Sequence, residues 1–370
     1  MAEEFESAMR ENPGCAASEP PQELLARVSS LAASRRCPLS REQYVEGILQ
    51  GQRTILARAI TLIESSREAD RLLAEQIVED CLPHCGDSIR LGITGVPGAG
   101  KSSLIEALGM YLIEAHQQKV AVLAIDPSSQ LSGGSILGDK TRMTELAANE
   151  MAFIRPSPAR GSLGGVARRT REAMLLCEAA GYNRIIVETV GVGQSETTVH
   201  GMVDFFMLIL LTGAGDELQG IKRGVMELAD LVAINKADGD NEKAAARARG
   251  EAQNALHYFP ASPSGWTARA QTCSARTGKG IAELWQCVLE HSALTKGNGW
   301  FERHRRSQTR NWMQEIIQQG LLQQFEAHTA VQECKQALER EVLEGRTTSF
   351  RAARTLLDLY SQRGTGLPAK

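Results

Sequence analysis

One eight-residue stretch restricts the folds open to this chain more than any other feature. Residues 95–102 read Gly-Val-Pro-Gly-Ala-Gly-Lys-Ser, the Gly-x4-Gly-Lys-Ser pattern of a phosphate-binding loop. An apolar run (89–94) precedes the loop and a helical pattern follows from 103, as a strand-loop-helix unit requires. A glycine-rich turn alone would not need lysine and serine at these positions, so the stretch predicts nucleotide binding.

The expected chemistry follows from the loop's groups. Its backbone N–H groups point at phosphate oxygens, Lys101 reaches the outer phosphates, and the Ser102 hydroxyl can bind a magnesium ion. The N-terminus of the following helix adds partial positive charge behind the phosphates. The nucleotide-binding residues expected here are Gly95, Val96, Pro97, Gly98, Ala99, Gly100, Lys101, Ser102 and Ser103.

A second motif indicates the base. An apolar run ends in Asn235-Lys236-Ala237-Asp238, and in guanine-binding proteins this Asp accepts from the guanine N1–H and 2-amino groups. Adenine lacks that donor pair, so ATP would leave a buried acceptor unmatched, at a cost of roughly a hundredfold or more in affinity. Alone the motif could be a polar turn. However, it follows the phosphate loop in the expected order, and Ser274-Ala275-Arg276 later supplies a loop whose N–H can contact guanine O6.

A third strand pattern, 184–188, ends in Glu188, with Gly191 three residues on. A carboxylate at this strand end normally holds magnesium through water, and the glycine N–H contacts the γ-phosphate. The glycine-rich stretch 191–196 suits a switch loop. Val192 stands where many GTPases carry a water-orienting Gln, which predicts slow intrinsic hydrolysis; Gln194 is the alternative for that role.

Two aspartates belong to a fourth stretch. The apolar run 119–126 reads as an interior parallel strand ending in Asp126, and a loop of small residues leads to Asp139. We interpret both carboxylates as magnesium-side or γ-phosphate-sensing groups. For Asp139 the alternative is an N-cap of a helix beginning near 139. For Asp126 that alternative is weaker, because open α/β sheets bind ligands at the carboxyl ends of their strands.

Together these motifs resemble the MeaB/ArgK family of methylmalonyl-CoA mutase-associated GTPases, which includes the human methylmalonic aciduria type A protein. The resemblance rests on the runs at 126–129, 133–143, 188–196 and 215–222, and it covers about residues 40–362. It implies a chain that binds GTP or GDP with Mg²⁺ and attends an adenosylcobalamin-dependent acyl-CoA mutase of the methylmalonyl-CoA mutase type. Such proteins gate cobalamin loading and protect or reactivate the mutase.

The resemblance also implies roles for particular residues. Ser102, Asp126, Asp139 and Glu188 would hold the metal, and with Lys101 they would form the phosphate cluster. Residues 213–224 match a switch that couples nucleotide state to the mutase, with these polar candidates: Asp216, Glu217, Gln219 and Lys222. Lys222 or Arg223 could neutralise transition-state charge when a partner docks. The expected catalytic set is Lys101, Asp126, Asp139, Glu188 and Lys222.

Two other functions were weighed against this one. A metallochaperone GTPase delivering nickel or another metal would carry a dense Cys/His cluster beside its switches, but 120–200 holds only Cys177 and His200. A kinase would need an acceptor pocket and a base, and no motif supplies either. The run Cys81-Leu-Pro-His84-Cys85 offers three soft ligands, yet it lacks a fourth and also reads as the end of a helix.

Composition restricts partners and location. The net charge is −3 and no polybasic stretch occurs, so we expect neither nucleic-acid nor membrane-surface binding. No apolar run approaches the roughly 20 residues that span a bilayer. The first six residues are acidic where a presequence would be basic, which predicts a cytoplasmic location.

The expected fold is α/β: a mainly parallel P-loop GTPase sheet sandwiched by helices, with helical N- and C-terminal extensions. Strand patterns lie near 89–94, 120–125, 151–154, 184–188, 205–211, 231–234 and 271–273. The predicted divisions are a disordered N-terminus (1–38), a helical segment (39–87), the GTPase domain (88–295) and a C-terminal helical arm (296–370). The resemblance favours a homodimer through this arm, although an apolar stripe alone is more often packed within its own chain.

Overall fold

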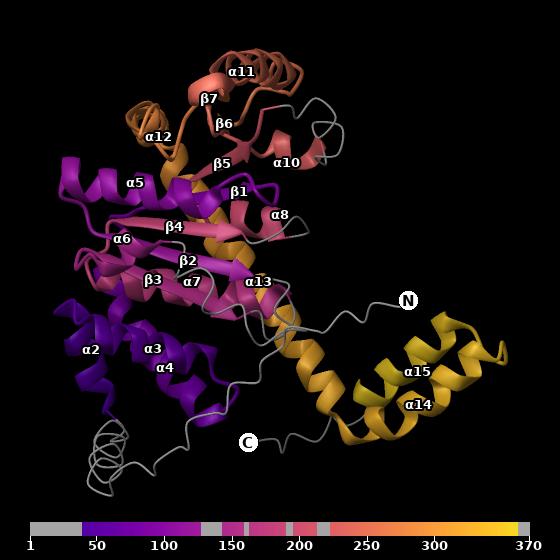
Figure 1. The fold of residues 1–370 in the computed structure, drawn as a ribbon. Helices are drawn as coiled ribbons and strands as arrows, with labels where there is room; N and C mark the ends of the chain where they lie inside the picture. Colours follow the sequence, from indigo (N-terminus) through magenta and orange to yellow (C-terminus); the bar gives the residue numbers. More distant parts are fainter. Residues whose placement is uncertain (1–38, 127–142, 159–162, 190–194, 213–222, 362–370) are drawn as a thin grey trace, which may run out of the picture.

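The core of this computed structural model is one seven-stranded parallel sheet (Figure 1). The structure describes residues 39–126, 143–158, 163–189, 195–212 and 223–361. The strands are β1 (Ile89–Gly95), β2 (Val120–Asp126), β3 (Ala152–Pro158), β4 (Arg184–Thr189), β5 (Phe205–Leu210), β6 (Leu231–Ile234) and β7 (Arg269–Thr272). Their order is β3-β2-β4-β1-β5-β6-β7, and every neighbouring pair is parallel. The α/β fold class and the seven predicted strand positions are therefore confirmed.

The apolar sequence of the strands explains why the sheet is interior. Side chains alternate between the faces of a strand, and in β2 Ala121 and Leu123 join one buried cluster while Val120 and Val122 join another. Helices α5 (Lys101–His116), α6 (Thr144–Ala148) and α12 (Ile281–Gly297) supply the second cluster. Helices α7 (Leu163–Ala179) and α8 (Ser195–His200) supply the first. Beside β6 and β7, α10 (Arg223–Glu227), η3 (Gly239–Asn241) and α11 (Glu242–Leu256) complete the layers.

A helical segment precedes the sheet. It contains α2 (Arg41–Leu49), α3 (Arg53–Glu64), α4 (Glu68–Cys81) and the short η1 (Leu82–His84), and it packs mainly on α7. A capping box begins α2, because the Ser40 hydroxyl accepts from the Gln43 N–H while the Gln43 side chain accepts from the Ser40 N–H. The predicted disordered stretch 1–38 lies outside the described residues.

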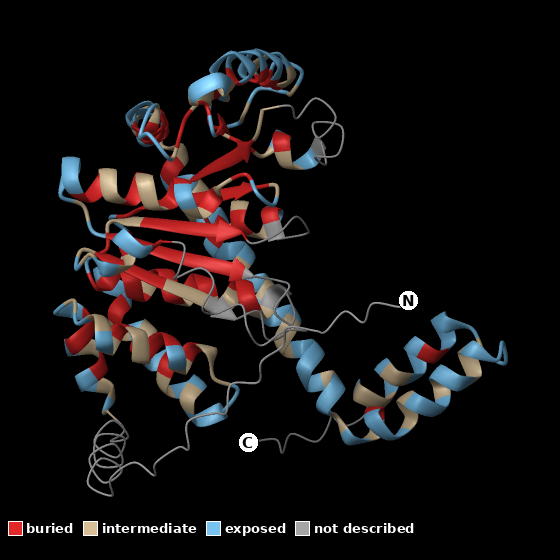
Figure 2. Ribbon diagram, in the orientation of Figure 1, coloured by how far each residue is buried: buried red, intermediate tan, exposed pale blue. Residues whose placement is uncertain are grey.

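The chain continues as three C-terminal helices. The 28-residue α13 (Trp300–Ala327) starts beside the sheet, passes α7 and extends away from the core (Figure 1). Beyond it, α14 (Thr329–Leu343) and α15 (Ser349–Ser361) pack on each other. Figure 2 shows a mixture of exposed and intermediate residues in this distal region, and the buried residues of the three helices are Phe301, Gln308, Val331 and Ala352. Within the described ranges, no helix combines the length and hydropathy needed to cross a membrane.

Candidate functional site

The phosphate-binding loop joins the end of β1 to the start of α5, as predicted. Gly98 and Gly100 have φ values of 80° and 84°, in the left-handed region that favours glycine. A Cβ on Gly95 would lie 2.4 Å from the main-chain oxygen of Ile209 on the neighbouring β5. The glycines of the motif thus have a local steric cause: the loop turns tightly and passes close to a strand.

Lys101 and Ser102 begin α5 beside the buried end of β4. The Lys101 ammonium donates to the main-chain oxygen of Gly95 at 2.8 Å. The Ser102 hydroxyl donates to Glu188 Oε1 at 3.2 Å, and Glu188 is only 2 % exposed. A hydroxyl and a carboxylate side by side are oxygen ligands of the kind Mg²⁺ takes, with phosphate and water completing its shell. These two residues therefore fit the predicted magnesium role.

The other predicted phosphate-side groups are only partly described. Asp126 is the last residue of β2, whose register with β4 sets Ile125 opposite Thr189, so its main chain lies at the same sheet edge as Glu188. The side chain of Asp126 is outside the described part, as are Asp139, Gly191 and Lys222. The whole of 127–142 and 213–222 is likewise outside it, so the roles assigned to these residues stay predictions.

Asn235 and Lys236 connect the base-recognition loop to the phosphate loop. The Asn235 amide donates to the main-chain oxygen of Ala99 at 2.8 Å and accepts from the Ala275 N–H at 3.2 Å. The Lys236 ammonium donates to the Gly98 oxygen at 3.0 Å. A Cβ on Gly100 would lie 2.7 Å from the Asn235 amide nitrogen. Three loops distant in sequence are thereby held together around one side chain.

Asp238 and Ser274 form the far side of this junction. The Ser274 hydroxyl donates to Asp238 Oδ2 and accepts from the Thr277 N–H at 3.2 Å. The Arg276 guanidinium lies 3.8 Å from the same carboxylate oxygen and is largely exposed. The carboxylate is thus oriented by a hydroxyl rather than locked in a tight ion pair, and its second oxygen is available for a ligand's N–H donors.

A cavity of about 790 Å³ opens between these loops and α5, within the size range of ligand pockets. Eight of the predicted nucleotide-binding residues line this cavity: Gly100, Ser103, Asn235, Lys236, Asp238, Ser274, Ala275 and Arg276. Sequence reasoning missed the opposite wall, which Met110, Tyr111 and Glu114 on α5 contribute. Their only signal was the exposed face of a helix that follows a phosphate loop. The arrangement has the shape and donor set to hold a purine with its phosphates at the α5 N-terminus.

The run from Cys81 to Cys85 contains the last residue of α4 and the short helix η1 that follows it. The Cys85 thiol donates to the main-chain oxygens of Cys81 and Leu175, and burial raises the pKa of Cys81 to about 11 and of Cys85 to about 12. Among the described residues, no group of three or more His, Cys, Asp or Glu side chains is placed to hold a metal ion. The structure therefore supports the interpretation of this run as a helix end.

Comparison with known proteins adds an independent line of evidence. Residues 56–330 match the family model described as methylmalonyl-CoA mutase-associated GTPase MeaB. The chain is 49 % identical to the GTPase ArgK of Escherichia coli over 278 residues, which cover 75 % of this chain and 84 % of that protein. It is 44 % identical to the mitochondrial methylmalonic aciduria type A homolog of Mus musculus over 327 residues, covering 86 % and 79 % respectively.

A solved structure agrees with this grouping. The crystal structure of a LAO/AO transport system kinase superposes with a TM-score of 0.71 at 37 % identity. The match covers 88 % of this chain and 100 % of that one.

Proposed function

Because this chain belongs to the MeaB family of methylmalonyl-CoA mutase-associated GTPases, we propose that it uses GTP to gate cobalamin loading of a B12-dependent acyl-CoA mutase and to protect or reactivate that enzyme. The chain is a nucleotide-binding P-loop GTPase. The finer proposal concerns the partner: a mutase of the methylmalonyl-CoA type, to which the chain reports whether GTP or GDP is bound.

One observation carries the choice of GTP: the junction in which Asn235 joins the phosphate loop to the loop of Ser274, with Asp238 facing the cavity. Because the same side chain contacts both loops, the base and the phosphates of one nucleotide occupy a preorganised frame. Asp238 supplies the acceptor that guanine's N1–H and 2-amino groups require. Adenine would leave that acceptor without a donor.

Mg²⁺ belongs to this proposal. Ser102 and Glu188 would hold the ion from the described side of the site, and we propose that Asp126 and Asp139 complete the set. Bound there, the ion would neutralise charge on the β- and γ-phosphates. The chain's own contribution is to fix the oxygen ligands: Glu188 is buried at the end of β4, and Ser102 is fixed at the first turn of α5.

Coupling to the mutase would run through the two loops predicted as switches. In P-loop GTPases such loops are held by the γ-phosphate and magnesium and relax on hydrolysis. Two described helices begin in the last two residues of these stretches, since α8 starts at Ser195 and α10 at Arg223. Helix α8 contacts β1, β4 and α7, so a change in the preceding loop has a direct route into the core. Within the first switch, Val192 in place of a water-orienting Gln favours slow hydrolysis until a partner completes the site.

The test is to measure phosphate release from GTP and from ATP, with and without a purified adenosylcobalamin-dependent methylmalonyl-CoA mutase. We expect slow GTP hydrolysis alone, acceleration by the mutase, and far lower turnover of ATP. Lys101→Ala should remove the activity, whereas Lys243→Ala, an exposed change on α11, should retain it. Equal turnover of the two nucleotides would refute the assignment of the base, and unaltered GTP turnover at saturating mutase would refute the partner.

The metallochaperone alternative gains no specific support from the described residues, as the absence of a soft-ligand group there indicates. Affinity capture from a cell extract separates it from the main proposal. Recovery of a cobalamin-dependent mutase with the GTP-loaded chain is expected, and recovery of a nickel enzyme in its place would reverse the choice.

A further inference from the structure

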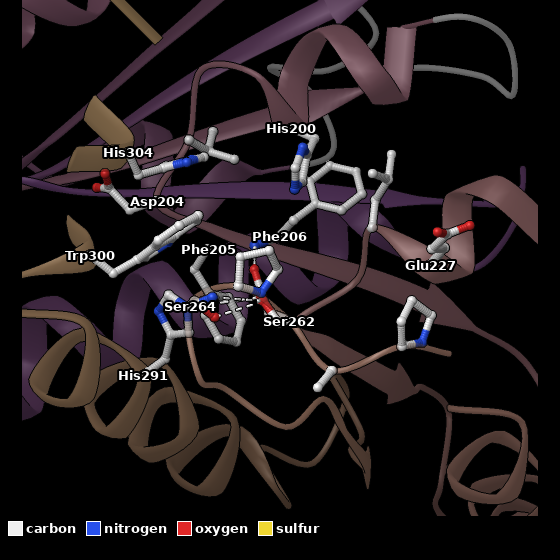
Figure 3. A pocket seen from close by; sticks show the side chains of 16 residues that line it. His200, Asp204, Phe205, Phe206, Glu227, Ser262, Ser264, His291, Trp300 and His304 are labelled. Carbon is white, nitrogen blue, oxygen red and sulfur yellow. Dashed lines mark hydrogen bonds and ion pairs between the residues drawn. The ribbon is translucent and has the colours of Figure 1, made fainter. Parts of the chain in front are cut away.

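A second cavity, drawn in Figure 3, is lined by residues at the amino ends of the strands, whereas the nucleotide site lies at their carboxyl ends. Its volume is about 420 Å³, and its floor includes Phe205 and Phe206 at the start of β5 and Asp230 immediately before β6. Parallel α/β sheets bind nucleotides at the carboxyl ends of their strands, where the phosphate loop lies. The second cavity opens at the amino ends, so a molecule bound there would not compete with GTP for space.

Four helices converge on this cavity, in addition to strand β5. His200 ends α8, Glu227 ends α10, His291 comes from α12, and Trp300 and His304 begin α13. Figure 3 shows these side chains arranged around one space, with Ser262 and Ser264 on a connecting loop at its lower side. The Trp300 and His304 rings stack at a centroid distance of 5.5 Å and an interplanar angle of 20°. Aromatic and imidazole rings thus form much of the lining.

The cavity has an uneven charge. Its sixteen lining residues include three carboxylates, Asp204, Glu227 and Asp230, and neither Lys nor Arg. Asp204 is balanced from behind, because it accepts from the Arg305 guanidinium at 2.7 Å and 2.8 Å. Among the described residues of the lining, Asp230 and Glu227 have no such cation, so this part of the lining favours a cationic ligand over an anionic one.

Two groups lie against the Asp230 carboxylate. Its Oδ2 accepts from the Phe206 N–H at 2.9 Å, while Oδ1 lies 3.8 Å from His291 Nε2. Burial lowers the pKa of His200 and of His291 to about 4, so these imidazoles are neutral near pH 7 and do not balance the carboxylate. Burial also raises the pKa of Asp230 to about 7, while the hydrogen bond from the Phe206 N–H acts in the opposite direction.

We propose that this cavity is a binding site for a small aromatic amine, taken as the ammonium form, with the cation at Asp230 and Glu227 and the ring among Trp300, His200 and His304. A carboxylate paired with an ammonium makes a charge-assisted hydrogen bond, and an aromatic wall attracts both the cation and the ligand ring. An anionic ligand would meet Glu227 and, near pH 7, a partly ionised Asp230, with no Lys or Arg among the described lining residues. The size of the cavity matches a compact ligand rather than a peptide.

The test is isothermal titration calorimetry of the full-length chain with benzylamine and with its uncharged analogue benzyl alcohol. The titrations are made in the presence of saturating GDP, and the benzylamine titration is repeated without GDP. We expect saturable benzylamine binding below about 10 mM, a range suited to so small a probe. Benzyl alcohol should bind about tenfold more weakly or worse, because it cannot form the charge-assisted bond. Benzylamine should bind with GDP present and absent. No saturable binding, equal binding of the alcohol, or displacement by GDP would each overturn the proposal.

Variants locate the site. Asp230→Asn and Glu227→Gln should each weaken benzylamine about tenfold while leaving GDP affinity unchanged. Glu227 is exposed, so its variant remains informative even where Asp230→Asn impairs folding, which circular dichroism would reveal. Glu251→Gln, an exposed carboxylate change on α11 away from the cavity lining, is the matched control and should bind benzylamine as the parent does. Benzylamine binding that is unchanged both in Glu227→Gln and in a folded Asp230→Asn variant would refute this location.

Discussion

Single side chains define the nucleotide site at the residue scale, and Asn235 shows how. Its amide nitrogen contacts the Ala99 oxygen, its amide oxygen contacts the Ala275 N–H, and the side chain is almost fully buried. The nearby Gly100 leaves the space that this amide occupies. The Asn235-Lys236-Ala237-Asp238 motif thus connects separate loops through hydrogen bonds. Substitution of Asn235 would therefore also affect the contacts of the other loops.

Asp238 allows the sharpest prediction at this scale. Asp238→Asn should weaken GTP about a hundredfold and strengthen xanthosine triphosphate, because the amide offers an N–H where xanthine offers a carbonyl oxygen. The amide oxygen can still accept from the Ser274 hydroxyl, so the loop should keep its shape. Titration calorimetry with both nucleotides measures the exchange. Asp240→Asn, two residues away and exposed, is the control, and unchanged GTP affinity in Asp238→Asn would contradict the role given to this carboxylate.

The raised pKa of Asp230 predicts how the stability of the fold depends on pH. Burial raises its pKa from an ordinary 3.8 to about 7, so the folded chain holds a proton that the unfolded chain releases. The stability from this group is present below about pH 4 and is lost as the pH rises through 7. Asp230→Asn removes that loss. The free energy of unfolding of the variant, relative to that of the parent, should rise by about 2 kcal/mol between pH 4 and pH 8, a figure reduced for the 20 % exposure of the side chain.

The measurement is urea unfolding of the parent and of Asp230→Asn across this pH range. Two histidines act in the opposite direction: burial lowers the pKa of His200 and His291 from 6.5 to about 4, so their stability is present above pH 6.5 and lost as the pH falls through 4. The parent curve should therefore be flatter than that of the variant. A stability difference that stays constant from pH 4 to pH 8 would contradict the raised pKa.

Helix α13 is the element whose position depends most on a few polar contacts. The Arg305 guanidinium donates to both oxygens of Asp204 and to the main-chain oxygens of Gly86 and Ser88. Asp204 also accepts from the N–H of Arg90, at the start of the sheet. Trp312 adds a hydrogen bond to the Gly201 oxygen at 3.3 Å. The first half of α13 is thereby fixed to the amino ends of β1 and β5.

Breaking the Arg305 contact tests this anchor. Asp204→Ala should destabilise the fold by about 3 kcal/mol, because it leaves a largely buried guanidinium without its carboxylate. It should also speed proteolytic cleavage within α13. Arg306→Ala, on the exposed side of the same helix, should change neither stability nor cleavage by more than experimental error. A double-mutant cycle with Arg305→Ala isolates the pair, and additive losses would show that the two side chains do not act together.

Elements with local patterns were the ones predictable from sequence. Unbroken apolar runs such as 205–210 fix a buried strand, and Gly98 and Gly100 fix a turn that only glycine adopts comfortably. The order of the strands was not predictable, because no local pattern sets β4 between β2 and β1. The contact between Asp204 and Arg305 joins residues 101 positions apart and carries no motif. The described residues of the candidate nucleotide site could be grouped from the sequence because they form motifs, whereas the second cavity draws on single residues from five elements.

Across the whole molecule, the two ends of the sheet carry different tasks. The carboxyl ends hold the loops of the nucleotide site, and the amino ends hold the second cavity and the anchor of α13. Helices α8 and α10, which follow the predicted switches, connect the carboxyl ends of the strands to the second cavity. Helix α8 ends at His200 and α10 ends at Glu227, and both residues line that cavity. Such a layout lets one edge sense nucleotide while the other contacts the arm.

The arm itself supports the last prediction, a homodimer formed through its distal surface. Met313, Ile317 and Leu321 recur every fourth residue on α13 and are 56 %, 51 % and 54 % exposed, with Leu322 beside them at 56 %. An exposed apolar stripe of this kind on a helix that has left its own core indicates a surface for association.

We expect the parent to sediment as a dimer. The double variant Ile317→Glu with Leu321→Glu should weaken association about a hundredfold or more, because charges replace central apolar contacts. Gln318→Glu, on an exposed neighbouring position, should leave the dimer intact. Analytical ultracentrifugation across a concentration series measures both. GTP binding should persist in the double variant, since the cavity beside α5 takes no residue from the arm. A monomeric parent, or a double variant as dimeric as the parent, would show that this surface serves another contact.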